Sequence, residues 1–243
     1  MEKFNEESAQ NFFQILDVLT ENTTRIGAVA EATSSVMQQG NAENKESALI
    51  FGAEVYRLIV VYTHAMLEYT LREITRNSLK YNLNLELPTH FNFVGTNSPK
   101  ISLKELRINY SGWGVDDIIL RSIDSQLDSI SFSSTTDIVN HLKAAGHQTP
   151  KKIRDTYFPT IQELCMRRHQ IVHRADISKQ AKGQKPESIE PTEVRKWVGM
   201  TISFLFEVFR FSLPIAYRPR LDPIIDKQID RVWDSYRLKK SRG

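Results

Sequence analysis

The segment from residue 46 to residue 80 constrains the fold of this chain more than any other. Its apolar side chains recur with a period near 3.6 residues, and polar side chains fill the positions between them. The apolar positions are Leu49, Ile50, Val55, Leu58, Ile59, Tyr62, Met66, Leu67, Leu71 and Ile74. The pattern predicts one long helix that must bury its apolar face against other elements.

The most apolar run of the chain, residues 48–67, is interrupted by Glu54, Arg57 and His64. A membrane span needs about 20 residues with few or no charges, so we expect a buried core helix and no membrane partner. The N-terminus, MEKFNEESAQ, is too polar and acidic for a signal peptide. The single cysteine, Cys165, allows no disulfide within the chain. These features predict a cytoplasmic protein.

Residues 4–39 contain no proline and follow helical spacing loosely, which predicts one long or broken helix. Two prolines and a glycine make residues 82–100 a loop or a short extended segment. The stretch 101–130 is ambiguous, although residues 115–127 fit a short helix.

A Ser/Thr cap, an acidic first turn and a terminal Gly146 predict a short helix in SSTTDIVNHLKAAG. Residues 156–175 form a further predicted helix, and the polar, lysine-rich stretch 178–188 is expected to be mobile. Another helix begins near Pro191 and should be ended by Pro214, Pro219 and Pro223. A short helix is expected in residues 224–243.

The sum of these segments is an all-α protein, most naturally an antiparallel helical bundle with insertions. A chain of 243 residues, 40% hydrophobic and 25% charged, is typical of a soluble globular protein with one good-sized core. The net charge of +3 argues against a strongly basic nucleic-acid coat protein, so any RNA or DNA contact would be local.

The motif RRHQIVHRAD, residues 167–176, places Arg168 among the apolar side chains on one face of its own helix. We call this face the apolar seam. At about 100° per residue, Arg168 lies in the middle of a line of apolar side chains. Because an unpaired buried guanidinium costs several kcal/mol, this position must offer it a carboxylate, an interface or a polar cavity. His169 and His173 share one flank of the seam, and Arg167 and Arg174 share the other.

A structural role for these side chains is one interpretation, since histidines beside apolar faces are usually hydrogen-bonded and arginines can extend along a core edge. The HQIVH spacing suits a zinc pair, but no glutamate occupies the metalloprotease position and Cys165 supplies no obvious third ligand. We therefore predict no metal and no cofactor. Cys165 lies in the apolar seam, where a thiol is a poor nucleophile.

Together, a guanidinium and an imidazole on one helix are the groups that phosphodiester chemistry needs. Imidazole can move a proton near neutral pH. Guanidinium can hold two phosphate oxygens and stabilise the charge of a pentavalent transition state.

The spacing Arg168-x4-His173, with the polar His169 after the arginine, resembles the R-x(4–6)-H signature of the HEPN superfamily. The order of the segments is also similar: a core helix with HAMLEYTLREI, the capped short helix, the motif helix, a polar loop and a final amphipathic helix opened by IEPTEV. The resemblance covers residues 46–213. The N-terminal segment 1–45 and the C-terminal tail 214–243 look like additions.

The resemblance implies an antiparallel four-helix bundle of HEPN type, with an extra N-terminal helical segment, a loop-rich insertion and a short basic C-terminal helix. It also implies a homodimer whose two motif helices share a cleft. The resemblance also implies an activity, because many members of the family look like metal-independent endoribonucleases of toxin–antitoxin or anti-phage systems. The ribose 2′-OH attacks the phosphate and leaves 2′,3′-cyclic phosphate and 5′-OH ends. His173 would be general acid or base, Arg168 would bind the phosphate, and His169 would assist.

Glu68 is a further candidate, because some members of the family carry an acidic residue on a neighbouring helix that orients the arginine or a histidine. The alternative is a solvent-facing Glu68 paired with Arg72 at i+4. Arg167 and Arg174 would contact RNA from the motif helix. The lysines of the polar loop, Lys179, Lys182 and Lys185, would hold its backbone, unless they only solvate the loop.

Two other functions remain open at this stage. The chain could be a non-catalytic helical module that binds a partner protein or a nucleotide, because family resemblance does not guarantee activity. It could also be a subunit of a larger defence complex that an antitoxin or another partner protein keeps silent.

Overall fold

A computed structural model gives the structure of the chain and describes residues 2–39, 44–81, 92–96, 100–174, 176, 186–213 and 217–236. Regular structure in these residues is entirely helical, which confirms the predicted all-α class. The helices are α1 (Glu2–Gln39), α2 (Lys45–Tyr81), α3 (Leu103–Asn109), α4 (Val115–Ser129), α5 (Thr135–Ala144), α6 (Lys151–Arg174), α7 (Pro191–Ser212) and α8 (Arg218–Ser235).

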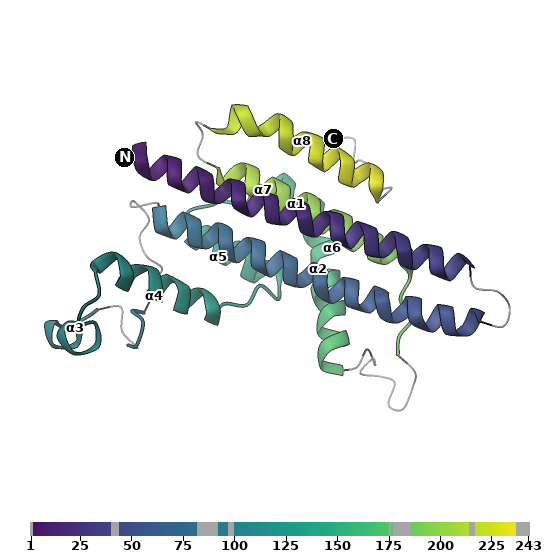
Figure 1. Cartoon of the computed structure of the whole chain (residues 1–243), viewed down its shortest axis with the longest axis horizontal. Helices are drawn as coiled ribbons and strands as arrows, with labels where there is room; N and C mark the ends of the chain where they lie inside the picture. Colours follow the sequence, from purple (N-terminus) through teal and green to yellow (C-terminus); the bar gives the residue numbers. More distant parts are fainter. Residues whose placement is uncertain are drawn as a thin grey trace.

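The two longest helices, α1 and α2, lie side by side and run antiparallel (Figure 1). Residues 4–39 form one unbroken helix, which is the simpler of the two predicted forms. The two axes approach closely where Gly52 of α2 faces Met37 of α1. A Cβ atom added at Gly52 would lie 2.3 Å from the Met37 Sδ atom, so the glycine leaves room for the methionine.

One hydrophobic core joins α1, α2, α6, α7 and α8. Leu67 and Ile74 of α2 are fully buried in it, beside Leu164 of α6 and Phe209 of α7. The ends of the chain contribute as well, since buried side chains of α1 and α8 belong to the same core, including Leu19, Ile26, Ile225 and Val232. The N-terminal helix and the C-terminal helix are therefore packed parts of this core.

A side arm made of α3 and α4 extends from the left-hand end of α2 in Figure 1. Helix α4 covers the short helix predicted at 115–127 and packs against α2 through Ile123 and Leu127. Helix α3 was not predicted separately. Ser102 caps it, accepting a hydrogen bond from the Glu105 N–H, while the Glu105 carboxylate accepts from the Ser102 N–H.

Two proline predictions were wrong. Pro219 and Pro223 do not follow α7 as terminators but lie inside α8, which begins at residue 218 instead of 224. Helix α6 begins at residue 151 instead of 156 and accommodates Pro159 in its interior. A proline is tolerated in the first turn of a helix, where the N–H has no intrahelical partner, so Pro219 suits the start of α8.

Two predicted helix signals are confirmed, and two predicted irregular stretches lie mostly outside the described residues. Helix α5 has the predicted Ser134 cap, which accepts a hydrogen bond from the Asp137 N–H, and Gly146 follows it with a positive φ of 83°. Pro191 occupies the first turn of α7 as predicted. The predicted loop 82–100 and the predicted mobile stretch 178–188 lie mostly outside the described residues.

Helix α2 is the one helix in the described residues that is long and apolar enough, by length and composition, to cross a membrane. The central helix of a soluble protein has the same composition. In this fold α2 contacts α1, α6 and α7, and its buried side chains form much of the core.

Candidate active site

The RRHQIVHR motif forms the C-terminal end of α6. The helix ends at Arg174, and Asp176 follows with φ 62° and donates its N–H to the Gln170 carbonyl at 3.1 Å. This left-handed residue satisfies one of the last helical carbonyls and turns the chain away from the helix axis. The motif side chains lie at the C-terminal end of α6, where Arg167 is buried and Ile171 still packs against the core.

His169 and His173 lie together on the exposed side of this helix end. Their rings are 4.7 Å apart, centroid to centroid, at an interplanar angle of 42°. Both side chains are exposed, and the exposed Val172 and Met166 flank them. The structure therefore brings together the two predicted imidazoles in a position that a large ligand can reach.

Arg168 is half-buried at the edge of the same surface. Its Nε atom is buried and has no hydrogen-bond partner among the described residues, and its guanidinium forms no ion pair with them. At Arg168 the apolar seam of α6 is thus only partly packed against the rest of the protein. Among the described residues no carboxylate pairs with this cation, and no contact joins it directly to His173.

Glu68 and His64 of α2 face this arginine from the neighbouring helix. The His64 Nδ1 atom lies 3.7 Å from the Glu68 Oε2 atom, and Glu68 Oε1 accepts a hydrogen bond from the Phe132 N–H at 3.3 Å. Arg72 does not pair with Glu68. It donates instead to the carbonyls of Leu127 and Ile130 at the end of α4. The solvent-facing pair of Glu68 with Arg72 is therefore not formed, and Glu68 instead lies between His64 and the Phe132 N–H.

His64 is 1% exposed, and neither ring nitrogen has a hydrogen-bond partner among the described residues. Burial lowers the pKa of His64. The Glu68 carboxylate opposes that shift, and the Arg168 guanidinium adds to it. The imidazole is therefore neutral at pH 7. In the sequence, His64 stands out only because it interrupts the apolar run of residues 48–67. Its i, i+4 relation to Glu68 was the signal that could have identified it.

Cys165 lies one turn before Arg168 and is 4% exposed. Burial raises the pKa of its thiol to about 12, with a further contribution from Glu68 that Arg168 opposes. A thiol with this pKa is protonated at neutral pH and is a poor nucleophile. The geometry agrees with the inert role expected from the sequence.

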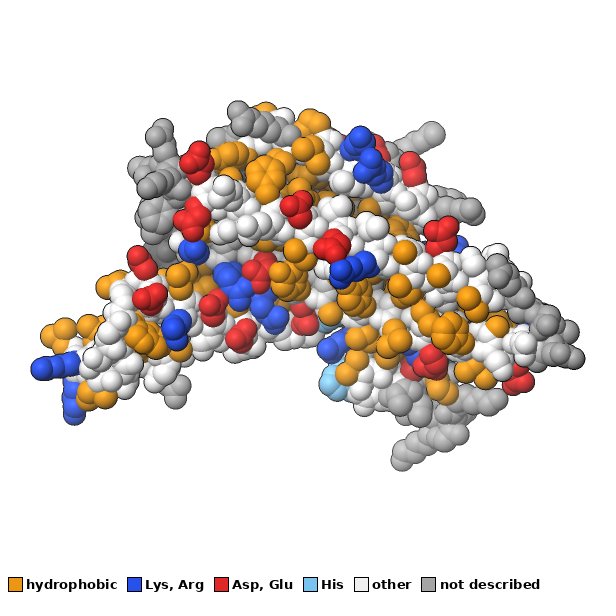
Figure 2. Space-filling model, in the orientation of Figure 1, with side chains coloured by type: hydrophobic (Ala, Val, Ile, Leu, Met, Phe, Trp, Pro, Cys, Tyr) orange, Lys and Arg blue, Asp and Glu red, His pale blue; other side chains and the backbone are white. Residues whose placement is uncertain are grey.

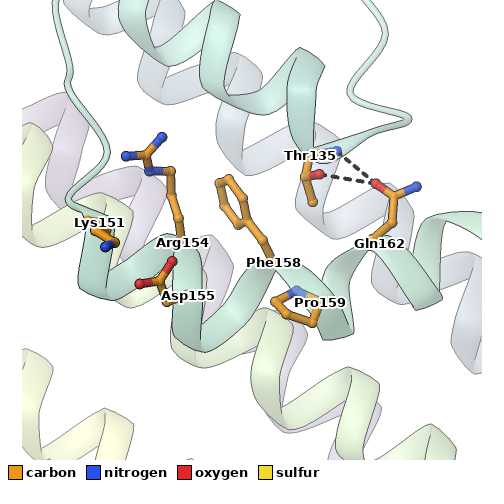
Figure 3. A pocket seen from close by; sticks show the side chains of 7 residues that line it. All are labelled: Thr135, Lys151, Arg154, Asp155, Phe158, Pro159 and Gln162. Atoms are coloured by element: carbon orange, nitrogen blue, oxygen red, sulfur yellow. Dashed lines mark hydrogen bonds between the residues drawn. The ribbon is translucent and has the colours of Figure 1, made fainter.

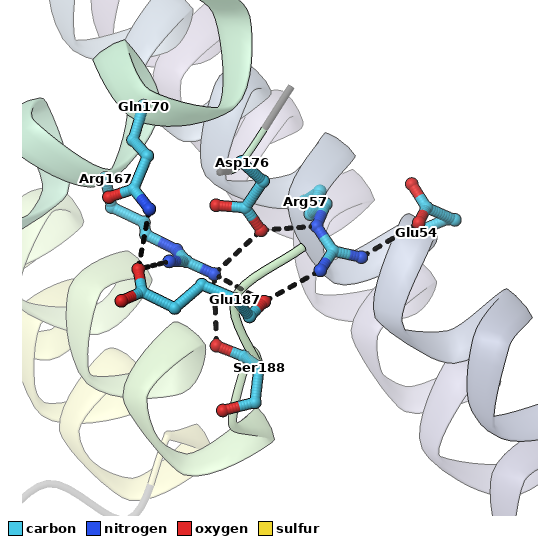
Figure 4. Close-up of polar contacts among 7 residues, drawn as sticks. All are labelled: Glu54, Arg57, Arg167, Gln170, Asp176, Glu187 and Ser188. Atoms are coloured by element: carbon cyan, nitrogen blue, oxygen red, sulfur yellow. Dashed lines mark hydrogen bonds and ion pairs between the residues drawn. The ribbon is translucent and has the colours of Figure 1, made fainter. Parts of the chain in front are cut away.

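Arg167 requires a correction. It was expected to contact RNA from the flank that it shares with Arg174, but it is 8% exposed and points into the protein. Its guanidinium bonds to the carboxylates of Asp176 (2.9 Å) and Glu187 (2.5 Å), and to the carbonyls of Glu187 and Ser188 (Figure 4). With its charge paired and both terminal nitrogens bonded, Arg167 holds the chain around the helix end and is not available to bind a phosphate.

Arg57 of α2 completes this buried ion network. Its Nε atom donates to Asp176 Oδ2 at 2.6 Å, so one carboxylate oxygen accepts from two arginines (Figure 4). Arg57 also donates to the Glu187 carbonyl and to the exposed Glu54. The network joins α2, α6 and the segment leading into α7, and it fixes the end of the motif helix.

Of the four other predicted RNA contacts, the structure describes Arg174 but not the three lysines. Arg174 is half-buried at the last residue of α6 and forms no ion pair with the described residues. Lys179, Lys182 and Lys185 lie outside the residues that the structure describes.

A shallow pocket of about 540 Å³ lies at the other end of α6, next to the start of α5. Figure 3 shows Lys151, Arg154 and Asp155 on one side of it and Phe158 with Pro159 on its floor. Gln162 accepts hydrogen bonds from the N–H and hydroxyl of Thr135 across its rim. The pocket contains no imidazole and is separated from the motif by about two helical turns.

Within the described part of the chain, no three His, Cys, Asp or Glu side chains are grouped as metal ligands. The chemistry that the motif surface can supply is proton transfer by imidazole and anion binding by guanidinium. Comparison of the chain with family models, with curated proteins and with solved structures finds no match.

Proposed function

We propose that this protein is a metal-independent endoribonuclease whose catalytic groups are Arg168, His173 and His169, with Glu68 in a positioning role. The observation that supports it best is the contrast between adjacent arginines. The charge of Arg167 is paired inside the protein, whereas Arg168 has no ion pair with the described residues and lies beside an exposed imidazole pair.

The chemistry follows from these groups. One imidazole removes the proton of the ribose 2′-OH, whose oxygen attacks the adjacent phosphorus. The bond from phosphorus to the 5′-oxygen breaks, and an imidazolium returns a proton to that oxygen. The guanidinium stabilises the charge on the non-bridging oxygens. The products are a 2′,3′-cyclic phosphate and a 5′-OH end, and DNA is not cut because it lacks the attacking hydroxyl.

The four-helix core of HEPN type would consist of α2, α5, α6 and α7, with α1 and α8 added around it. This assignment and the role of toxin or anti-phage effector depend on the resemblance of the RRHQIVHR segment. In such an arrangement two copies of the chain bring their motif helices together, and Arg168 and His173 of both copies line one cleft. An antitoxin or another partner protein would cover this cleft until release.

The test is cleavage of a labelled RNA in the presence of EDTA. We expect fragments with 2′,3′-cyclic phosphate ends, and no cleavage at a site that carries a single 2′-deoxynucleotide. His173→Ala and Arg168→Ala should each lower the rate by about 100-fold or more. Arg168→Lys should recover only part of the loss, because an ammonium cannot form the bidentate contact.

Lys152→Ala is the matched control, because Lys152 is exposed at the opposite end of the same helix. It should cleave like the wild type, and circular dichroism should show that all variants are folded. Cleavage that EDTA abolishes, or that survives His173→Ala and Arg168→Ala unchanged, would disprove the proposal.

A non-catalytic module that binds a partner protein is the second candidate. A row of exposed apolar side chains on α2 favours it, namely Phe51, Leu58, Tyr62 and Tyr69. Figure 2 shows hydrophobic side chains gathered over the right-hand part of the molecule, where Figure 1 places the first half of α2, with histidine and basic side chains at the lower edge near the centre. This candidate predicts no cleavage, and partner binding that His173→Ala leaves intact.

A further inference from the structure

A groove separate from the motif surface lies between α1, α7 and α8. Its volume is about 680 Å³, within the range of about 300–1,000 Å³ that is typical of small-molecule sites. None of the three helices carries a residue of the proposed nuclease site. The groove is therefore distinct from the proposed nuclease site.

Two arginines line the groove from different helices, Arg195 of α7 and Arg231 of α8. Neither forms an ion pair with another described residue, in contrast to the buried Arg57 and Arg167. Arg195 donates one hydrogen bond to Ser34 Oγ at 3.1 Å, which holds it against α1. The groove therefore offers positive charge that the described part of the protein does not neutralise by ion pairing.

The opposite wall, on α1, offers hydrogen-bond acceptors. The hydroxyls of Thr20, Thr23 and Thr24 donate their own protons to the carbonyls four residues earlier, at 2.8–3.0 Å. Their oxygens can therefore accept from a ligand but have no proton left to donate. Glu31 on the same wall is an acceptor as well. A ligand that fits this wall carries several donors of its own.

Tyr236 at the end of α8 adds a donor. Its side chain is 9% exposed, and its buried hydroxyl has no hydrogen-bond partner among the described residues. Burial raises the pKa of Tyr236 to about 12, so the hydroxyl keeps its proton at neutral pH. Gly27 lies opposite, and even a Cβ atom there would stay 3.7 Å from the hydroxyl oxygen. A buried hydroxyl without a partner is costly, and a bound acceptor would remove that cost.

We propose that this groove binds a small phosphate ester of a polyol. The phosphate is held by Arg195 and Arg231, the hydroxyl groups of the ligand donate to the threonine oxygens and Glu31, and the Tyr236 hydroxyl donates to the ligand.

Isothermal titration of the full chain with three probes tests this site: ribose 5-phosphate, AMP and inorganic phosphate. Both esters should bind, and inorganic phosphate should bind at least about tenfold more weakly, because it lacks the ribose hydroxyls that donate to α1. A clear preference for AMP over ribose 5-phosphate would identify a nucleotide as the source of the ester, and equal affinities would identify a sugar phosphate.

Arg195→Gln and Arg231→Gln should each weaken ester binding by about tenfold, the loss expected for one charge-assisted hydrogen bond. Tyr236→Phe should weaken binding several-fold while the Tm of the ligand-free protein stays equal or rises, because the variant removes an unpaired hydroxyl. Lys227→Gln, an exposed change on α8 outside the groove, is the control and should bind like the wild type. Absence of binding by both esters, equal affinity for inorganic phosphate, or arginine variants that bind normally would overturn the proposal.

Discussion

Asp176 is the residue on which the end of the motif helix depends most. Its carboxylate is 1% exposed and accepts from Arg57 and Arg167, which come from α2 and α6. A buried carboxylate between two guanidiniums offsets part of the large desolvation cost of both cations. Removal of this buried negative charge would leave the two guanidiniums paired only with carboxylates that are largely exposed, Glu187 at 51% and Glu54 at 61%.

Asp176→Asn should therefore lower the free energy of unfolding by about 3–5 kcal/mol, the usual cost of breaking a buried ion pair. Glu54→Gln is the matched control. Glu54 pairs with the same Arg57, but its side chain is 61% exposed, so we expect a loss below about 1 kcal/mol. Urea denaturation followed by circular dichroism measures both. Equal small losses in the two variants would show that the network contributes little.

His147 gives the fold a dependence on pH. Burial lowers its pKa to about 4 from an ordinary value of 6.5, and the charge of Arg218 contributes. Between these two values the unfolded chain binds a proton that the folded protein does not. The contribution of His147 to stability is thus complete above pH 6.5 and is lost progressively as the pH falls toward 4.

His147→Gln should reduce this loss. Ser78 Oγ donates to the Ile74 carbonyl and lies 2.6 Å from His147 Nε2, so the ring donates to the serine, a bond that a glutamine amide can replace. Between pH 6.5 and 4 the variant should lose on the order of 2 kcal/mol less stability than the wild type. Urea denaturation at several pH values measures the difference, and parallel pH profiles would contradict the assignment.

At the scale of elements, the sequence predicted the helices with strong internal signals. The period of α2, the Ser134 cap of α5 and Pro191 at the start of α7 each act within a few residues, so they can be read without the fold. Pro219 misled because a proline that ends one helix can equally begin the next, whereas Pro223 lies in the interior of α8. Only the docking of α8 on α7 decides between the two.

The candidate site was predictable only in part, for a related reason. The periodicity of α6 located Arg168, His169 and His173 correctly on one helix. It could not tell that Arg167 would be the buried arginine, because its partner Asp176 lies beyond the helix end and Arg57 lies 110 residues earlier. Tertiary partners, which the helical period does not encode, decided which arginine was buried.

Helices α1 and α2 approach each other closely at the pair Gly52 and Met37. In an unobstructed helix, Gly→Ala is stabilising by about 1 kcal/mol. Gly52→Ala alone should give none of that gain, because the new methyl group collides with the methionine side chain. In a Met37→Ala background the same change should be stabilising by about 1 kcal/mol.

Thermal unfolding of the four proteins in this double-mutant cycle measures the interaction. Additive effects would mean that the methionine moves aside at no cost and that the helix spacing is not set at this contact.

At the scale of the whole molecule, the exposed apolar face of α2 offers the proposed dimer an interface. Leu58 is 67% exposed and lies on the same helical face as Phe51, Tyr62 and Tyr69. If two copies pair through this face, Leu58→Glu should shift the protein to a monomer and reduce RNA cleavage with it. Leu103→Glu, on the remote helix α3 and 86% exposed, should change neither.

Analytical ultracentrifugation over a range of protein concentrations, together with the cleavage assay, separates the outcomes. A wild-type protein that is monomeric and still cleaves RNA would show that one copy is sufficient. A Leu58→Glu protein that remains dimeric would place the interface elsewhere.

Cys165 offers a means of watching the motif helix in solution. It is the single sulfhydryl group of the chain and lies beneath α2 in the closed fold. A maleimide dye can react with it only in molecules where the two helices have separated. The labelling rate at neutral pH therefore records how often the native protein opens at this seam, without any engineered probe.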